Sequence, residues 1–369
     1  MRELCRQVLG AYLEQLWGRH QELVDAMVRD GWPREMARVG LELHRATWRA
    51  EELTRAVEAE LSVVGRAADR QVIWPERLHH IWPALPGAGL TPVLVGVLLG
   101  IEQAVRASSR GQELARVLSE GAPWRLLDQE ADWRDADVVV VSGADDTVRA
   151  VRQKMDGRGR VVGYGHRVSI GLVLDDPLGA VELEEIAKKM ALDVVMWHQR
   201  GCFSLRGVLF YGSEARRLQF CEALASKIAE WEGAWGIDGA ALDAGDLAHR
   251  AQALGMAQMA GPVWCEGVGF VREISGPFSG GREALHSVTV HPVEGPDGVA
   301  KALAVEPSSL QGVAVAGAWG EDRDGWLRAL ATAGATRIAA AGELQAPPPG
   351  WWHDGQPNAL SWARFMTID

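Results

Sequence analysis

The spacing of apolar residues predicts a helical beginning for the chain. Between residues 2 and about 66, apolar side chains recur at intervals of three and four, which is the period of an amphipathic helix. The first such run comprises Leu4, Val8, Leu9, Tyr12, Leu13 and Leu16. Gly31-Trp32-Pro33 interrupts the pattern, and proline suits the start of a second helix. Because no alternation typical of a strand occurs before about residue 71, we expect a helical N-terminal layer.

From residue 71 onward, short apolar runs alternate with helical segments. Strands are expected over residues 78–81, 104–106, 137–143, 160–165, 168–174 and 208–212, with a further one beginning at Val194. Helices are expected over residues 92–100, 111–120, 147–155, 178–192 and 214–232. The run from Asp137 to Gly143 is rich in valine, which is typical of a buried parallel strand. Such alternation predicts a doubly wound α/β sheet.

The rest of the chain continues the mixed pattern. Helices are expected over 240–254 and 325–334, and strands over 267–273, 287–291, 312–316, 337–341 and 362–368. The crossover near residue 190 is the best candidate for a domain boundary. The last strand ends at the C-terminus, and an exposed strand edge usually needs cover. We therefore expect it to pair across a subunit edge in a homodimer.

Composition narrows the possible functions. The 369 residues carry a formal charge of −11, which argues against a protein that binds nucleic-acid phosphates. The most apolar stretch, Leu90 to Ile101, has about 12 residues, whereas a bilayer span needs roughly 20. The charged N-terminus does not resemble a secretory signal. We expect a cytoplasmic protein with no transmembrane segment.

Cys202 is the thiol most suited to chemistry. The chain has four cysteines and no CxxC pair, so neither a disulfide scaffold nor a structural metal site is expected. Cys202 is expected in a polar loop after a strand, with Gly201 before it. Arg200, Arg206 and His198 could supply the positive charge that favours a thiolate. The alternative interpretation is that Cys202 is one more small buried residue.

Two further features are weak when taken singly. Gly143 lies where a strand should meet a helix N-terminus, a usual place for a phosphate, although no G-x-G-x-x-G motif is present. A plain turn glycine is the simpler explanation. His353-Asp354-Gly355 offers an acid–base pair in a turn, or it only closes the loop.

The order of these motifs resembles the acyl-CoA reductase family typified by the fatty-acid reductase of bacterial luminescence, within the aldehyde dehydrogenase superfamily. The resemblance covers about residues 75–369, and each motif alone is loose. The matching segments are His80-Ile81 with the loop after it, Arg106-Ala-Ser108-Ser109-Arg110, Val141-Ser-Gly143, Gly165-His166-Arg167-Val-Ser169, Gln199-Arg-Gly-Cys202-Phe-Ser, Leu310-Gln311, Gly334-Ala-Thr-Arg337-Ile338, His353-Asp354-Gly355 and Arg364-Phe-Met-Thr-Ile-Asp369.

The resemblance implies an aldehyde dehydrogenase-like α/β fold with four parts. These are a helical N-terminal segment (1–70), a Rossmann-type nucleotide-binding domain (71–192), an α/β catalytic domain (193–345) and a C-terminal loop and strand (346–369). It also implies a reaction in which a Cys202 thiolate attacks an acyl thioester and a reduced nicotinamide then delivers hydride to release an aldehyde. The acyl donor would be acyl-CoA or an acyl carrier protein.

The resemblance also assigns cofactor and substrate residues. Arg106, Ser108 and Ser109 match the segment that holds the adenosine ribose. Superfamily members that prefer NAD often carry glutamate where Ser109 stands. Without that carboxylate, Arg106 and Arg110 could bind the 2′-phosphate of the cofactor. This favours NADPH, with NADH as the alternative. Gly143, Gly165 and His166 would line the cofactor site, and His353 would line the substrate or nicotinamide pocket.

The sequence departs from the family pattern at several positions. Leu85 stands where the family has an asparagine that helps to form the oxyanion hole, and losing one such donor can cost about 10²–10³ in rate. Ile101, Gln103, Arg167 and Phe203 also differ from the expected residues. Two alternatives follow. The chain could be a non-reducing acyltransferase or thioesterase that uses the same Cys202, or a catalytically silent family member that acts as a structural partner.

Overall fold

The computed structural model describes residues 3–64, 70–155, 157, 159–175, 182–239 and 244–367. These residues form two compact units, one of residues 1–166 with 346–369 and one of residues 167–345. The division therefore lies after His166 and not after residue 192, where we expected it. The reason is that the strand Val168–Leu174 belongs to the sheet of the second unit.

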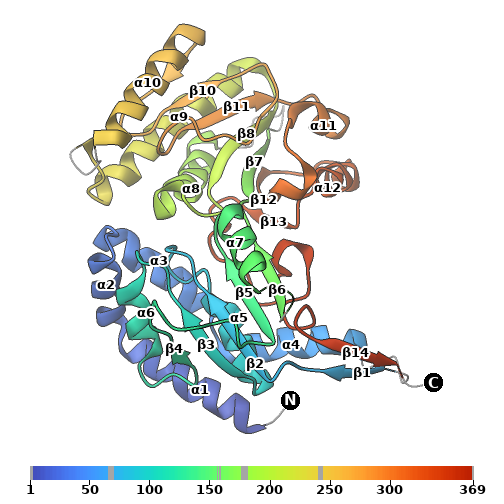
Figure 1. The fold of residues 1–369 in the computed structure, drawn as a ribbon. Coiled ribbons are helices and arrows are strands. Elements are labelled where there is room, and N and C mark those ends of the chain that lie inside the picture. Colours follow the sequence, from blue (N-terminus) through green and yellow to red (C-terminus); the bar gives the residue numbers. More distant parts are fainter. Residues whose placement is uncertain are drawn as a thin grey trace. The chain divides into compact units, whose positions relative to one another are not determined.

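The expected helical N-terminal layer is present in the first unit (Figure 1). It consists of α1 (Glu3–Gly18), α2 (His20–Arg29), α3 (Arg34–Thr47) and α4 (Ala50–Val64). Leu9, Leu13 and Leu16 are buried along one face of α1, as their spacing predicts. Pro33 caps the start of α3 with an extended ψ of 137°.

A five-stranded parallel sheet forms the core of the first unit, in the order β4-β3-β2-β5-β6. Its strands are β2 (Arg77–Ile81), β3 (Glu102–Arg106), β4 (Arg125–Leu126), β5 (Val138–Ser142) and β6 (Arg160–Tyr164). The helices α5 (Leu90–Leu99), α6 (Gln112–Ser119) and α7 (Asp145–Met155) connect them. In sequence order this is the 3-2-1-4-5 arrangement of a nucleotide-binding fold, and ligands bind such sheets at the carboxyl ends of the strands.

The second unit contains a seven-stranded sheet in the order β13-β12-β7-β8-β11-β10-β9. Its strands are β7 (Val168–Leu174), β8 (Leu205–Tyr211), β9 (Val263–Trp264), β10 (Val271–Glu273), β11 (Val288–Pro292), β12 (Leu310–Gly317) and β13 (Arg337–Ala340). Only β9 runs antiparallel to its neighbour among these described strands. The helices are α8 (Leu183–Val195), α9 (Glu214–Ala234), α10 (Ala244–Ala260), α11 (Val299–Ala302) and α12 (Arg323–Thr332).

The C-terminal segment returns to the first unit. The strand β14 (Arg364–Thr367) pairs antiparallel with β1 (Arg70–Ile73) and forms a two-stranded ribbon (Figure 1). Short 3₁₀ turns occur at η1 (Met196–Gln199), η3 (Pro296–Gly298), η4 (Pro307–Ser309) and η5 (His353–Gly355). The first residues of the helices expected over 178–192 and 240–254, and the end of the last expected strand, lie outside the described residues.

Candidate active site

Cys202 lies in a turn between η1 and β8, and its side chain is half-buried. We expected it to follow a strand, and this was wrong. The apolar run that begins at Val194 continues α8 as far as Val195 and then turns into η1. Periodicity cannot separate a short buried strand from the apolar end of a helix. Cys202 therefore precedes β8, at the amino end of the second sheet.

The turn before Cys202 has an unusual backbone. Trp197, His198 and Gln199 have φ values of 55°, 52° and 55°, so three consecutive residues with side chains adopt the left-handed conformation. Each costs about 1–3 kcal/mol and persists only where its surroundings enforce it. The buried Gln199 side chain supplies part of this restraint, because its Nε2 donates to the carbonyl oxygens of Leu205 at 2.6 Å and Ser287 at 2.9 Å.

Two side chains hold the peptides next to the nucleophile. Ser169 Oγ, at the start of β7, donates to the carbonyl oxygen of Cys202 at 2.7 Å and accepts from Gly312 N at 3.1 Å. Gln345 Nε2 donates to the carbonyl oxygen of Phe203 at 3.1 Å. Since both partners lie in the second unit, they fix the Cys202 loop to the sheet that carries it.

Two partly buried guanidinium groups act on Cys202. Arg337 lies over the ring of Phe203, 4.9 Å from its centroid, and donates to the carbonyl oxygens of Glu343, at 2.8 Å, and Leu344. Burial lowers the pKa of Arg337 to about 10, against the opposing effects of Asp193, Glu343 and Cys202. Burial also lowers the pKa of Arg206, which Cys202 again opposes. The interaction with Cys202 is the smallest of the causes that act on either pKa, and it opposes the effect of burial.

A buried carboxylate supports Arg337. Asp193 Oδ2 accepts from Gly342 N at 2.7 Å, and its Oδ1 accepts from Leu344 N at 3.2 Å. Burial raises the pKa of Asp193 to about 7, against these hydrogen bonds and the charge of Arg337. Neither Asp193 nor Gln345 was singled out from the sequence. A charged residue in an apolar strand, as in Arg337-Ile338-Ala-Ala, was the available signal for this network.

His198 does not supply positive charge to the site, contrary to expectation. Burial lowers its pKa to about 3, and the neighbouring His286, Arg200 and Arg282 act in the same direction. The imidazole is therefore neutral near pH 7.

The residues expected to bind the cofactor all follow strands of the first unit at their carboxyl ends. Arg106 ends β3, and its guanidinium donates to the carbonyl oxygen of Gln129. The next residues, 108–110, form a turn in which Arg110 N contacts Ser108 Oγ at 3.4 Å, and Ser109 and Arg110 are exposed. Gly143 follows β5, and Gly165 and His166 follow β6.

Hydrogen bonds connect the ends of β5 and β6. Gly143 N donates to the carbonyl oxygen of Tyr164 at 3.1 Å, and His166 N donates to Asp145 Oδ1 at 2.8 Å. Asp145 and Asp146 occupy the first turn of α7, so this helix N-terminus already holds negative charge. Gly143 is therefore a poorer place for a phosphate than the sequence indicated.

His353 lies on the first unit, whereas Cys202 lies on the second. The ring of His353 stacks on Tyr164 with centroids 3.8 Å apart, so it stands at the end of β6 beside Gly165. Glu60 anchors the following loop by accepting backbone hydrogen bonds from Asn358 (3.0 Å), Ala359 (2.8 Å) and Leu360 (2.6 Å). These contacts give His353 a structural role in the C-terminal loop, which it keeps whether or not it also contacts substrate.

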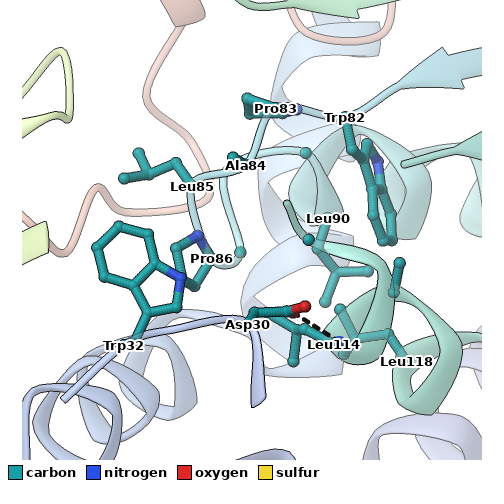
Figure 2. Close-up of a pocket in the computed structure, with 14 residues that line it drawn as sticks. Asp30, Trp32, Trp82, Pro83, Ala84, Leu85, Pro86, Leu90, Leu114 and Leu118 are labelled. Carbon is teal, nitrogen blue, oxygen red and sulfur yellow. Dashed lines mark hydrogen bonds between the residues drawn. The ribbon is translucent and has the colours of Figure 1, made fainter. Parts of the chain in front are cut away.

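Leu85 lies in the β2–α5 loop and lines a hollow with Trp32 and Trp82 (Figure 2). The glycines of this loop serve packing, because a Cβ on Gly89 would lie 2.0 Å from Trp82 and one on Gly87 2.4 Å from His44. Asp30 closes the hollow by accepting from Leu114 N at 2.9 Å (Figure 2). The side chain of Leu85 therefore offers this hollow no hydrogen-bond donor.

The described residues offer neither a metal site nor a membrane-spanning helix. No group of three or more His, Cys, Asp or Glu side chains in this part of the chain could hold a metal ion. Among the helices of the described ranges, none combines the length and the apolar character needed to span a membrane.

Comparisons with known proteins agree with this architecture. The family model described as acyl-CoA reductase (LuxC) matches residues 123–258 and 279–364, together more than half of the chain. None of the curated proteins matches the chain.

Solved aldehyde dehydrogenases share the fold at low sequence identity. An NAD-dependent benzaldehyde dehydrogenase from Corynebacterium glutamicum is 14% identical, with a TM-score of 0.67, over 99% of this chain and 84% of its own. An oxidoreductase from Marinobacter aquaeolei is 10% identical, with a TM-score of 0.71, over 99% and 85%. An NADP-dependent glyceraldehyde-3-phosphate dehydrogenase from Bacillus halodurans, complexed with NADP, is 11% identical, with a TM-score of 0.66, over 99% and 87%. The chain therefore belongs to the LuxC family of acyl-CoA reductases, aldehyde-forming oxidoreductases with the aldehyde dehydrogenase fold.

Proposed function

We propose that this protein reduces an acyl thioester to an aldehyde with NADPH, through an acyl group carried on Cys202. The observation that carries the proposal is the setting of Cys202, a half-buried thiol on a restrained turn that two guanidinium groups attract. The family membership supports the reaction type.

The chain's own residues account for the first step. The Cys202 thiolate attacks the thioester carbonyl carbon, the bond to the donor thiolate breaks, and that thiolate leaves and takes a proton. Arg337 and Arg206 stabilise the thiolate before attack, and Ser169 and Gln345 keep the loop in place. No histidine base is required, since the guanidinium groups favour the reactive form of the thiol.

Bound NADPH would supply the hydride that reduces the acyl group, and Cys202 would then leave the acyl carbon as a thiolate and release the aldehyde. The residues at the carboxyl ends of the strands of the first sheet fit a phosphorylated dinucleotide. Ser109 and Arg110 are exposed after β3, and no carboxylate lies between Arg106 and Gly111. In the proposed site, Arg106, Ser108, Ser109 and Arg110 hold the adenosine end. Gly143, Gly165, His166 and His353 line the carboxyl ends of β5 and β6.

The apolar Leu85 favours a second candidate function. If the oxyanion donor is missing, Cys202 can still exchange acyl groups, and the protein then acts as an acyltransferase or thioesterase. Acyl-CoA and acyl carrier protein thioesters are both proposed donors.

We further propose a homodimer built on the ribbon of β1 and β14. Within the described sheet of these two strands each has one unpaired edge, and Phe365 and Met366 on β14 are exposed. Exposed edges of this kind favour pairing with a second chain.

An assay with acyl-CoA thioesters of increasing chain length tests the proposed activity. We expect absorbance at 340 nm to fall with NADPH, and more slowly with NADH, while the aldehyde accumulates. Release of free thiol without loss of NADPH would indicate the acyltransferase or thioesterase function. If no acyl-CoA or carrier-protein thioester released a thiol or caused oxidation of the cofactor, both catalytic functions would be contradicted.

A further inference from the structure

We propose that Glu232 and His286 form a positioning pair that holds the left-handed turn before Cys202 in its reactive geometry. The pair lies outside every motif that the family resemblance covers. The inference rests on the proposed role of Cys202 as the nucleophile, and it concerns how the fold prepares that thiol.

Glu232 is an ionisable residue deep inside the second unit. It lies near the end of α9 with a side chain that is 2% exposed. Its Oε1 contacts His286 Nδ1 at 2.6 Å and accepts from Gly269 N at 2.9 Å, and its Oε2 accepts from Val268 N at 2.7 Å. A buried carboxylate with three such partners is held in one orientation.

The backbone is shaped to enclose this carboxylate. A Cβ on Gly267 would lie 2.2 Å from Glu232 Oε2, and one on Gly269 would lie 2.6 Å from the carbonyl oxygen of His286. These two glycines allow the loop to approach both members of the pair. His286 itself adopts a left-handed φ of 52°, with a fully buried ring.

The segment around His286 makes three contacts with two residues of the turn before Cys202, His198 and Gln199. The His286 ring stacks on that of His198, with centroids 5.8 Å apart and planes 13° apart. Arg282 Nη1 donates to the carbonyl oxygen of His198 at 3.3 Å. Ser287 accepts, through its carbonyl oxygen, from Gln199 Nε2 at 2.9 Å. The left-handed residues are thus held from one side by the segment that Glu232 fixes.

A strained turn persists only while its surroundings enforce it. If the pair is broken, the turn relaxes and Cys202 moves away from Arg206 and Arg337. The thiol then loses reactivity, while groups that bind the acyl donor and the nucleotide are untouched. Glu232 and His286 are therefore positioning residues for Cys202 and need not touch substrate.

The variant His286→Asn is the sharpest test. Asparagine tolerates the left-handed backbone and keeps a donor for Glu232, but it removes the ring that stacks on His198. Glu232→Gln tests the carboxylate itself. The controls are His291→Asn, an equally buried histidine bonded to Thr289 and Gly276, and Glu230→Gln, an exposed residue on the same helix.

The readout is the rate of Cys202 alkylation by iodoacetamide, mapped by peptide mass, with Cys5 of the first unit as the internal reference. We expect about a tenfold slower reaction of Cys202 in His286→Asn and Glu232→Gln, with kcat reduced in parallel and KM for acyl-CoA within twofold. Both controls should keep the wild-type rate.

An unchanged or faster reaction of Cys202 in His286→Asn overturns the proposal, and so does an equal loss in His291→Asn, which would reveal general loosening. If Glu232→Gln does not fold, His286→Asn decides. Alkylation needs no turnover, so an absence of acyl-Cys202 in the wild-type protein would refute the proposed function without altering this comparison.

Discussion

At the scale of single residues, the proposed reactivity of Cys202 depends on charge and not on a histidine base. His198 is neutral and supplies no positive charge, and the charges of Arg337 and Arg206 are the ones that interact with Cys202. Arg337 is fixed by two backbone carbonyl groups and by the Phe203 ring, so its position is set by the fold.

Replacing Arg337 should raise the pH at which Cys202 becomes reactive. In Arg337→Met we expect the midpoint of the alkylation rate against pH to rise by about one unit, because removal of a neighbouring positive charge disfavours the thiolate. A shift of one pKa unit corresponds to about 1.4 kcal/mol. Arg337→Lys keeps the charge and should shift the midpoint less. Identical midpoints in all three proteins would show that Arg337 does not act on the thiol.

Asp193 should make stability depend on pH. Burial raises its folded pKa to about 7, above the ordinary 3.8, so the folded state binds this proton more tightly than the unfolded state. The stabilisation is complete below about pH 4 and is lost as pH rises through 7, with a slope of at most about 1.4 kcal/mol per pH unit.

Urea unfolding of wild-type protein and Asp193→Asn between pH 4.5 and 8.5 measures this effect. The free energies of the two proteins should converge or cross as pH rises, because the variant lacks the titration. The hydrogen-bond acceptors that Asp193→Asn loses change its free energy of unfolding by the same amount at every pH. Parallel curves across this range would contradict the assignment.

At the scale of elements, the periodicity of the sequence predicted most strands and helices of both sheets. The valine run at β5 and the helix at α9 occur where the pattern indicated them. The extension of α8 into the left-handed turn was not predictable, since it depends on tertiary contacts of Gln199 and His198 that leave no local signal. Cys202 and the family motifs were identified from the sequence. Asp193, Glu232 and His286 were not, because they come from segments that are far from their partners in the sequence.

The loop between β2 and α5 depends on its glycines for packing. Gly89→Ala would place a Cβ 2.0 Å from Trp82, so we expect a loss of about 1–3 kcal/mol in the free energy of unfolding. In Gly143→Ala the nearest neighbour of the new Cβ would be Thr147 at 3.5 Å, so the free energy of unfolding should change by less than about 0.5 kcal/mol. Urea titrations of the two variants should therefore differ clearly, and equal losses would contradict the packing role of Gly89.

At the scale of the whole molecule, the chain consists of two units, and the proposed reaction uses both. The first contains the five-stranded sheet whose carboxyl ends we propose to bind the nucleotide, and the second contains Cys202. We expected the boundary between the two units at residue 192. It instead follows β6, because the next strand, β7, forms its hydrogen bonds with β8 and β12 of the second sheet. Only the sheet pairing reveals that β7 joins the second sheet.

The proposed dimer can be tested at the open ribbon. Lysines at Phe365 and Met366 (Phe365→Lys with Met366→Lys) should convert a dimer to a monomer in sedimentation experiments, since charges on a strand edge oppose pairing. Ile338→Lys, on the edge strand β13 of the second unit, serves as the control and should leave the mass unchanged. A dimer that survives the double substitution would exclude the ribbon as the interface.

In the proposed reaction, Cys202 carries the acyl group that NADPH reduces. The most direct measurement is the intact mass of the protein after incubation with acyl-CoA, followed by addition of NADPH. We predict an increase equal to one acyl group in the wild-type protein, no increase in Cys202→Ala, and loss of the adduct with formation of aldehyde when NADPH is added. An adduct that persists in Cys202→Ala, or aldehyde formation by that variant, would contradict the account.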